Sequence, residues 1–478
     1  MSNVLAGLAP ARVWHYFEEI SNIPRGSGNE KGIADYLEAF ANEHGIAVTR
    51  DAMHNIFMRK PASAGCEAAP ALLLQGHTDI VCEKNADVVH DFLTDPIKLL
   101  VKDGWVTADG TTLGSDNGIA VAFMLAALED DALVHPTLEC LFTTQEEVGL
   151  DGAKAFDGSQ VTATRMINLD CGGEGTTTVS CAGGMRIDLS RTLNSEPFAG
   201  AAIRIFVTGL AGGHSGGQIN KYLGNSNKIM ARVLADLEYV NLISITGGSK
   251  DNAIPRECEA VVAVPCADCA KKSIARMEQT IRAELGPADK DFAIIVTDAV
   301  APAQMYTAED TRKAYLLMNI ADNGVIAMSH SIEGLVDASC NMGVVRMEED
   351  RIIISFSPRA SMESLNDDTH NRLEMLAEVM GFDFDCHSRY PGWAYAQVSP
   401  LRDLLCETYR DLTGKEMSIH AVHGGLECGI LLSKVPGLDI VAIGPDAEGA
   451  HSPDERVNIA SVERTWGFLK EVIARCAK

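Results

Sequence analysis

Several features that mark membrane and secreted proteins are missing from this sequence. No stretch approaches the roughly twenty consecutive apolar residues that cross a bilayer. The residues after Met1 lack a basic segment followed by an apolar core, so we expect no secretory signal. Basic residues are scarce, because 40 Lys and Arg stand against 66 Asp and Glu, a formal net charge of −26. That deficit argues against nucleic acid or an anionic membrane as a partner.

The cysteines lack the pattern of a disulfide framework or a zinc finger. Thirteen of them, an odd number, are scattered over 478 residues, which is typical of reduced thiols in the cytoplasm. Cys266 and Cys269 form a C-x-x-C pair, but no second pair follows at zinc-finger spacing, and we interpret this pair as structural. We therefore expect a cytoplasmic protein.

What is present is the composition of a folded globular protein. Apolar residues make up 46% of the chain and charged residues 22%. The length of 478 residues exceeds what one hydrophobic core normally supports. We therefore expect two or three domains.

The most informative stretch ends in two adjacent carboxylates. Thr143-Thr144-Gln145-Glu146-Glu147 follows the apolar, strand-like run 138–142. At the end of a strand, one carboxylate can hold a metal ion while its neighbour reaches a water molecule on that ion, as metal-assisted hydrolysis requires. Taken alone, two adjacent glutamates are more often a solvated strand end. The metal interpretation therefore depends on further ligands elsewhere in the chain.

Further side chains of the metal-ligand type follow apolar runs or lie in glycine-containing loops. They are His77, Asp116, Asp170 and His451. Strand ends and their adjoining loops converge on one crevice in an open α/β sheet. Two imidazoles and three carboxylates suit a pair of zinc-like ions bridged by one carboxylate. Asp116 alone would also fit a helix cap, and Asp79 lies where its carboxylate can orient the His77 imidazole.

The order of these motifs resembles the M20 clan of metallopeptidases, and within it the bacterial dipeptidases. The matching segments are His77-Thr78-Asp79, Gly114-Ser115-Asp116-Asn117-Gly118, Glu146-Glu147, Asp170, 212–217, 252–257, 424–429 and His451-Ser452-Pro453-Asp454-Glu455. The likeness runs from the first helix to the last. Each motif is weak alone, but together and in this order they are highly specific.

The resemblance implies a role for each of these side chains. The implied ligands of two divalent ions are His77 and Asp170 for one ion, Glu147 and His451 for the other, and Asp116 as the bridge. Zinc is expected, with cobalt or manganese as alternatives. Glu146 would be the general base, and Asp79 would orient His77. The clan also implies a cis peptide bond after the bridging aspartate, here Asp116–Asn117.

One segment departs from the dipeptidases of the clan. After Asp170 they usually continue with a hydroxyl residue and acids, whereas this chain has Cys171-Gly172-Gly173-Glu174. The change removes negative charge near the metal ions and affects the expected fine specificity, but not the ligand. We do not expect Cys171 to compete as a soft ligand.

The pattern of the chain changes between residues 186 and 391. Runs at 201–207, 225–237, 242–246, 260–264, 271–285 and 292–296 follow a β-α-β-β-α-β order, the ferredoxin-like arrangement, and a looser second set covers 310–380. The chain then returns to supply His451. We therefore predict an α/β protein with a mixed-sheet zinc-peptidase catalytic domain, residues 1–185 and 392–478, and an inserted α+β lid domain, residues 186–391.

Polar residues of the predicted lid could hold a substrate. His214 could donate a hydrogen bond to the oxyanion of a tetrahedral intermediate. Arg359 could clamp a C-terminal carboxylate bidentately, and Asn252 could bind the same end of the peptide. In the clan, such His and Asn residues sometimes come from a partner subunit, which implies a homodimer. Glu427 lies in the segment 392–478 that returns to the catalytic domain. It could either contact the substrate or hold the metal ligands in position.

The resemblance thus implies hydrolysis of unblocked dipeptides, including Xaa-His, by a metal-activated water. A deacetylase or aminoacylase on the same scaffold is an alternative, because amide hydrolysis requires the same centre. A non-catalytic binding protein is another alternative, but the intact Glu146 argues against it.

Overall fold

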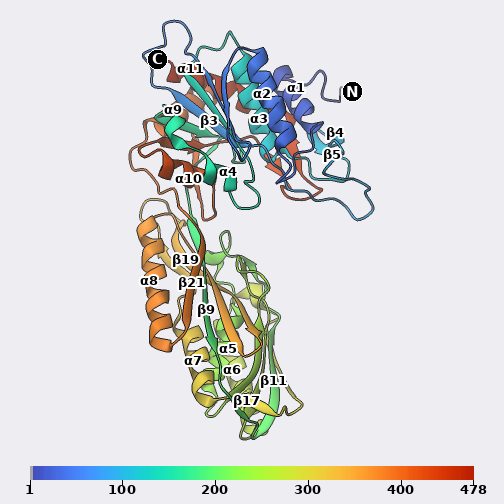
Figure 1. Cartoon of the computed structure of the whole chain (residues 1–478), viewed down its shortest axis with the longest axis vertical. Coiled ribbons are helices and arrows are strands. Elements are labelled where there is room, and N and C mark those ends of the chain that lie inside the picture. Colours follow the sequence, from blue (N-terminus) through green and yellow to red (C-terminus); the bar gives the residue numbers. More distant parts are fainter. Residues whose placement is uncertain (1–3) are drawn as a thin grey trace. The chain divides into compact units, whose positions relative to one another are not determined.

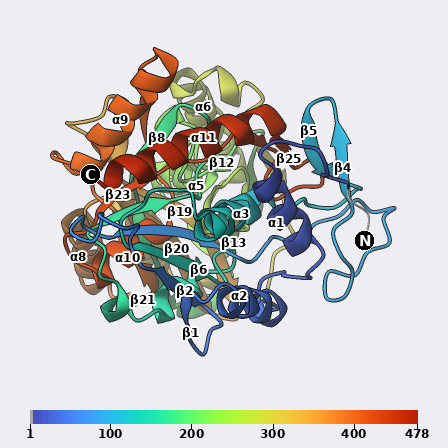
Figure 2. The ribbon, with the colours of Figure 1, turned by 90° about the horizontal axis from the view of Figure 1, so that it is seen from above.

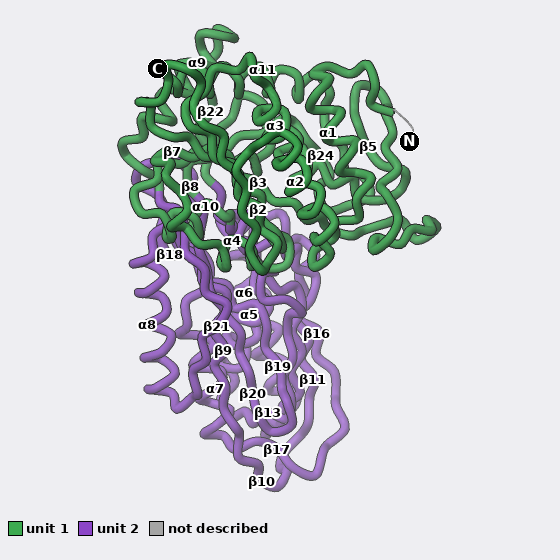
Figure 3. The backbone as a smooth tube through the Cα atoms, turned by 45° about the horizontal axis from the view of Figure 1, so that its top comes forward, with its two compact units in different colours: residues 1–180, 395–421, 426–478 green, residues 181–394, 422–425 purple. Residues whose placement is uncertain are grey.

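The computed structural model describes residues 4–478, and the chain divides into two compact units (Figure 3). Unit 1 comprises the chain up to Ser180, Tyr395–Ala421 and Leu426–Lys478, and unit 2 comprises Cys181–Ala394 and Val422–Gly425. Unit 1 is therefore discontinuous in sequence. Its boundaries lie a few residues from those expected at 185 and 392, and the short return of 422–425 to unit 2 has no counterpart in our prediction.

An eight-stranded mixed sheet forms the centre of unit 1 (Figure 1). In spatial order its strands are β1 (Ala47–Arg50), β2 (Ile56–Lys60), β6 (Leu138–Thr143), β3 (Leu72–His77), β7 (Arg165–Asn168), β23 (Asp439–Ala442), β8 (Thr176–Cys181) and β22 (Ser418–Val422). The neighbours β6, β3, β7 and β23 are parallel. Every residue of β3 is buried, as expected for a short apolar strand with both faces covered.

Helices cover the sheet of unit 1. They are α1 (Ala11–Ser21), α2 (Lys31–Glu43), α3 (Ser115–Glu129), α4 (Asp151–Ala155), α9 (Pro400–Thr413), α10 (Glu427–Lys434) and α11 (Ile459–Cys476), with a 3₁₀ turn at Gly158–Gln160. Helix α3 is apolar on all sides because it packs against β3 and also against α1 (Figure 2). A small separate sheet contains β24 (Ala447–Glu448), β25 (Arg456–Asn458), β5 (Trp105–Ala108) and β4 (Leu99–Lys102).

A nine-stranded sheet organises unit 2. Its main path is β16 (Ala293–Asp298), β11 (Ala201–Thr208), β15 (Cys258–Val264), β13 (Asn241–Gly247), β19 (Val336–Glu348), β20 (Arg351–Ala360), β9 (Gly183–Thr192) and β21 (Asp383–Tyr390), with β18 (Gly324–Met328) on β19. Its helices are α5 (Ser226–Asp236), α6 (Ala267–Glu284), α7 (Ala308–Ile320) and α8 (Glu363–Met380), with 3₁₀ turns at Ile219–Lys221 and Pro287–Asp289. Short pairs are β10 (Ser195–Pro197) with β17 (Gln304–Tyr306), and β12 (Gly213–His214) with β14 (Ala253–Ile254).

The ferredoxin-like set predicted for this region is present. The elements β11, α5, β13, β15, α6 and β16 follow each other along the chain, and their strands pair in the order β16-β11-β15-β13. The second set extends the same sheet through β19, β20, β9 and β21. The expected α/β architecture with an inserted α+β domain is therefore confirmed.

The expectation that all cysteines are reduced thiols is corrected for one pair. Cys266 and Cys269 form a disulfide at the start of α6, where the C-x-x-C spacing leaves their Cα atoms 5.3 Å apart. The Cys266 Sγ also accepts the main-chain N–H of Cys269 as the helix begins, at 3.3 Å.

No helix within residues 4–478 combines the length and apolar character that would let it cross a membrane.

Candidate metal centre

The metal-ligand side chains predicted from the sequence gather at the carboxyl ends of parallel strands in unit 1. His77 ends β3, Glu146 and Glu147 follow β6, and Asp170 follows β7. Because β6, β3 and β7 are adjacent and parallel, these ends lie at one edge of the sheet. Asp116, at the start of α3, and His451, in the loop between β24 and β25, reach the same place.

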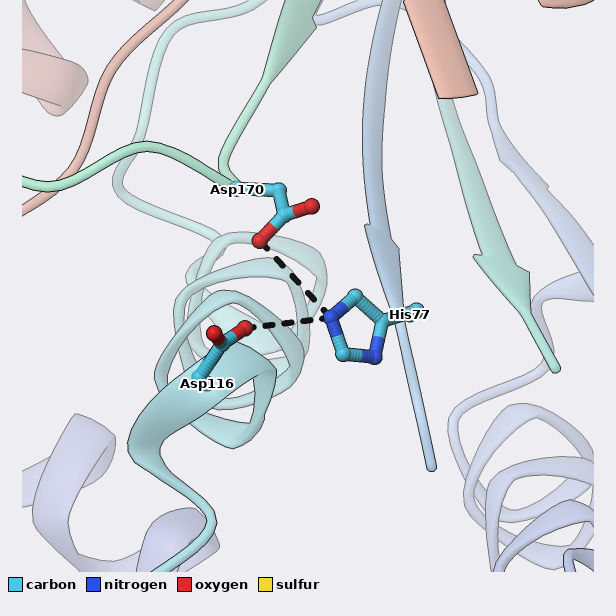
Figure 4. Close-up of side chains that lie close together, drawn as sticks. All are labelled: His77, Asp116 and Asp170. Atoms are coloured by element: carbon cyan, nitrogen blue, oxygen red, sulfur yellow. Dashed lines mark hydrogen bonds and ion pairs between the residues drawn. The ribbon is translucent and has the colours of Figure 1, made fainter. Parts of the chain in front are cut away.

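The two oxygens of Asp116 face two different imidazoles. His77 Nε2 lies 3.1 Å from Asp116 Oδ1 and 3.7 Å from Asp170 Oδ1 (Figure 4). His451 Nε2 lies 3.4 Å from Asp116 Oδ2 and 3.0 Å from Glu147 Oε1. A carboxylate that bridges two metal ions needs this placement, with one oxygen directed to each ion's ligand set.

The donor atoms fit two divalent ions. Three groups each bring their donor atoms within 4.8 Å of one another: His77, Asp116 and Asp170; His77, Glu146 and Glu147; and Asp116, Glu147 and His451. The first and third share Asp116 and coincide with the two ligand sets implied by the resemblance. Carboxylate and imidazole donors suit zinc and related ions. Cys171 is in none of these groups, and Glu174 is held by Arg464 at 2.6 and 2.7 Å.

The crowded carboxylates repel one another. Burial, together with repulsion from Asp170, Glu427 and Glu147, raises the pKa of Glu146 to about 9. Burial also raises the pKa of Asp170. Hydrogen bonds to Asp116 and Glu147 raise the pKa of His451 to about 10. This concentration of negative charge favours bound cations, so the electrostatics agree with the donor set.

The backbone at the start of α3, where Asp116 lies, has an unusual local conformation. The Asp116–Asn117 peptide bond is cis, which confirms the expectation from the resemblance. Gly114 has a φ of 72°, in the left-handed region that glycine adopts without steric cost. Gly118 is required for a different reason, because a Cβ there would lie 2.5 Å from Nη2 of the buried Arg25.

Asp79 makes more hydrogen bonds than the single contact with His77 that the sequence suggested. Its carboxylate accepts the main-chain N–H groups of Glu146 at 3.0 Å and Glu147 at 3.3 Å, and the hydroxyl of Ser27 at 2.7 Å. His77 Nδ1 lies 3.1 Å from the Asp79 main-chain oxygen and 3.5 Å from its carboxylate Oδ1. Asp79 therefore anchors the paired glutamates as well as the imidazole.

Glu455 is a residue whose role sequence reasoning missed. Its buried carboxylate accepts the main-chain N–H groups of Leu113 at 2.8 Å, Gly114 at 2.9 Å, Ser115 at 2.7 Å and Asp116 at 3.2 Å. The Ser115 hydroxyl adds a fifth bond at 2.6 Å. Glu455 lies four residues after His451 in the recognised motif, but nothing in its local sequence indicates a partner more than three hundred residues earlier.

Replacing Glu455 by alanine is expected to lower the free energy of unfolding by at least about 3 kcal/mol, because buried N–H groups left without acceptors cost about 1–3 kcal/mol each. Urea unfolding of the metal-free protein measures this change. The adjacent Asp454 is exposed, so Asp454→Ala serves as a control that should stay within about 0.5 kcal/mol of the parent. Equal stability of the two variants would contradict the role of Glu455.

The predicted substrate residues of unit 2 lie on its strands and turns. His214 is on β12 opposite Ala253 of β14, next to Asn252. His214 Nδ1 accepts the N–H groups of Gly216 and Gly217, both at 3.1 Å, which leaves the imidazole proton on Nε2. Partial desolvation and the charges of Arg359 and Arg186 lower the pKa of His214, although the residue is exposed, and so favour the neutral ring.

Arg359 is a buried guanidinium that lacks an acidic partner. It is 6% exposed, and no carboxylate of residues 4–478 forms an ion pair with it. Its Nη1 donates to the hydroxyl of Tyr390 at 3.1 Å. Arg359 and Tyr390 both pair with Gly184 of β9, which has no side chain to separate them. A buried cation without a counterion is suited to an anionic ligand.

Two side chains of unit 2 that we did not predict as site residues accompany these groups. The Tyr390 hydroxyl contacts Arg359, as described above. His423, in the short segment 422–425, is buried, and its Nε2 lies 2.7 Å from the Ser339 hydroxyl. Burial and the charge of Arg359 lower the pKa of His423 to about 4. Only the tertiary structure brings these residues to Arg359, so no local signal could have identified them.

Comparison with known proteins agrees with this geometry. The pattern of Peptidase family M20/M25/M40 matches residues 73–475. The cytosol non-specific dipeptidase of Escherichia coli (strain K12) is 39% identical over 478 residues, which cover 98% of each chain. The crystal structure of aminoacylhistidine dipeptidase from Vibrio alginolyticus superposes with a TM-score of 0.93 at 33% identity and covers 99% of this chain and 98% of that one.

A more distant structure, aminopeptidase PepT from Bacillus cereus, shares the fold at 18% identity and a TM-score of 0.57, and covers 98% of this chain and 100% of its own. The resemblance inferred from the sequence motifs is confirmed by the extent of these matches. The chain belongs to peptidase family M20/M25/M40.

Proposed function

We propose that this protein is a two-metal dipeptidase that hydrolyses unblocked dipeptides, including Xaa-His. The observation that carries the proposal is the position of Asp116, whose two oxygens face His77 and His451. The names of the Escherichia coli and Vibrio relatives, both dipeptidases, support the substrate class. The assigned ligands are His77, Asp116, Glu147, Asp170 and His451.

The residues of the centre divide the chemistry between them. When bound, a pair of divalent cations supplies Lewis acidity, which lowers the pKa of a water molecule and polarises the scissile carbonyl. Glu146 takes the proton of the attacking water and delivers it to the departing amine. Asp79 holds the main chain of Glu146 and Glu147 through two hydrogen bonds and so fixes the base beside the ligand.

Unit 2 supplies the groups assigned to the substrate. Arg359, buried and without an acidic partner, binds the free C-terminal carboxylate of the dipeptide. His214, with its proton on Nε2, donates a hydrogen bond to the oxyanion. Asn252 binds the carboxyl-terminal half of the substrate. Its main-chain oxygen already accepts the N–H of Ser215 at 2.9 Å, which ties its position to the turn after His214.

C-terminal amidation of a dipeptide is expected to lower kcat/KM by about 10- to 100-fold, because a charge-assisted hydrogen bond contributes about 1.5–3 kcal/mol. The measurement compares the free acid and the amide of one dipeptide by chromatography of the released amino acid. Equal rates for the two compounds would contradict the carboxylate clamp.

Two variants make this comparison specific for Arg359. In Arg359→Gln the ratio of the two kcat/KM values should fall towards one, because the free acid loses its partner. Arg346, on the same sheet, already pairs with Glu348 at 2.9 Å, so Arg346→Gln should preserve the ratio of the parent.

One experiment separates the candidate functions. Metal content by mass spectrometry, combined with hydrolysis assays on Ala-His and on N-acetylated amino acids, distinguishes a dipeptidase, a deacetylase or aminoacylase, and a binding protein without turnover. The same metal analysis tests zinc, and sedimentation velocity tests the homodimer that the resemblance implies.

We place the protein in the cytoplasm, in agreement with the cytosolic Escherichia coli relative.

A further inference from the structure

One acidic side chain of unit 1 is enclosed next to the candidate metal centre without belonging to it. Glu427, the first residue of α10, is 0% exposed. Its Oε2 accepts hydrogen bonds from Gln75 Nε2 at 2.5 Å and from the Thr143 hydroxyl at 2.7 Å. Its Oε1 is buried and has no hydrogen-bond partner within residues 4–478. Its enclosure and its two hydrogen bonds favour support of the neighbouring strand ends, one of the two roles expected from the sequence.

The hydrogen bonds continue from Glu427 to the strand ends that carry the assigned ligands. Gln75 Oε1 accepts from Asn168 Nδ2 at 2.6 Å, and Asn168 Oδ1 accepts the main-chain N–H of Asp170 at 3.1 Å. Gln75 lies two residues before His77 on β3, and Asn168 lies two residues before Asp170. All three polar side chains that link these strands to Glu427 are buried: Gln75, Thr143 and Asn168.

The donor at one end of this chain of hydrogen bonds, the Asp170 N–H, and the acceptor at the other end, Glu427, require the same direction. A glutamine or asparagine side chain has a donor end and an acceptor end, whereas Glu427 Oε2 accepts both of its hydrogen bonds. With Glu427 on one side, the Gln75 amide nitrogen must face it, and the amide oxygen then faces Asn168. The Asn168 nitrogen is engaged in turn, and its oxygen is left for Asp170. The main-chain N–H of Asp170 orients the Asn168 amide from the other end, and Glu427 supplies the acceptor that the Gln75 nitrogen then requires.

We propose that Glu427 is a positioning residue of the metal centre, because it is the terminal acceptor of the buried hydrogen bonds that tie Thr143, Gln75 and Asn168 together at the ends of β6, β3 and β7. The inference rests on the proposed function in taking His77 and Asp170 as metal ligands. Substrate recognition is assigned to other residues.

The test measures zinc affinity, which requires no substrate. Zinc is titrated into the metal-free protein in competition with a chromophoric chelator. Glu427→Ala is expected to weaken zinc binding by about 10-fold or more, as loss of a partner that orients a ligand does elsewhere. Glu427→Gln is expected to stay within about 3-fold of the parent, because its amide oxygen can accept both hydrogen bonds.

Glu139 provides a matched control in the same sheet. It is also 0% exposed, and it accepts hydrogen bonds from Arg59 at 3.0 and 2.8 Å and from the Thr162 hydroxyl at 2.6 Å. It lies near the start of β6, at the opposite end from the ligands. Glu139→Gln should lower stability in urea and leave zinc affinity unchanged. The zinc affinity of this variant shows whether the loss of any buried carboxylate weakens metal binding, or only the loss of Glu427.

The possible results divide clearly. Weakened zinc binding in Glu427→Ala and its recovery in Glu427→Gln support the proposal. Unchanged zinc affinity with a raised KM would show instead that Glu427 contacts the substrate, and unchanged affinity with lowered stability would show a purely structural role. If Glu427→Ala does not fold, Thr143→Val decides, since it removes one bond to Glu427 and should weaken zinc binding in the same direction. Wild-type protein that binds zinc but cleaves no dipeptide would overturn the proposed function alone.

Discussion

Replacing Glu146 by glutamine is expected to lower kcat by about 10²–10⁴-fold or more, because the attacking water loses its general base. The amide has the size of the carboxylate but does not take up the proton. Both metal ions should stay bound, since neither assigned ligand set includes Glu146. Turnover of a dipeptide and metal content by mass spectrometry, measured on the same preparation, test the two halves of this statement.

The same substitution at the adjacent Glu147 provides a direct comparison for Glu146→Gln. Glu147 Oε1 lies 3.0 Å from His451 Nε2 and belongs to an assigned ligand set, so Glu147→Gln should lose metal together with activity. The two substitutions are chemically identical and one residue apart, which controls for the general effect of removing a charge from the cluster. Loss of metal in Glu146→Gln would instead assign Glu146 as a ligand.

Replacing His451 by alanine is expected to weaken the binding of one metal ion by more than about 100-fold. Loss of a residue that only orients a ligand already costs about 10–100-fold in affinity, and His451 is assigned as a ligand itself. Its side chain is 52% exposed, so its removal leaves no buried cavity, and the fold should persist. Metal titration, with circular dichroism as the check on folding, measures the effect.

Another histidine of unit 1 serves as the control for this experiment. His420, on β22, is exposed, and its Nε2 lies 3.1 Å from the Ser418 hydroxyl. His420→Ala should bind both ions as the parent does. Full metal occupancy in His451→Ala would show that His451 is not a ligand and that Asp116 does not bridge to a second site.

The local sequence was sufficient to identify the candidate ligands at the strand ends. An apolar run that stops at a polar residue marks the end of a buried strand, and parallel neighbours in an open sheet bring such ends to one edge. His77 and Asp170 could be identified in this way because the signal lies within a few residues of each. The linear order of motifs added Asp116 and His451, which reach the same place from a helix start and a distant loop.

Side chains that act through distant partners could not be identified in the same way. Glu455 holds the turn before α3 through hydrogen bonds to residues about 340 positions earlier, and Glu427 reaches Gln75 across 352 positions. In the sequence, both are single glutamates near glycine or proline, as many surface residues are. The same holds for Tyr390, which meets Arg359 only because Gly184 separates their strands without a side chain.

The sequence by itself thus determined the family, the order of elements and the residues that we propose as metal ligands, since these depend on periodicity and on motifs read locally. Only the tertiary structure showed that the carboxylates of Glu455 and Glu427 are buried beside the candidate ligands. It also showed that the Arg359 guanidinium has no acidic partner within residues 4–478. Burial and hydrogen bonding depend on the packing of segments far apart in the chain, and those contacts leave no local pattern. Glu427 shows the difference: the sequence left open a substrate contact or support of the ligands, and only the structure shows that the side chain is 0% exposed.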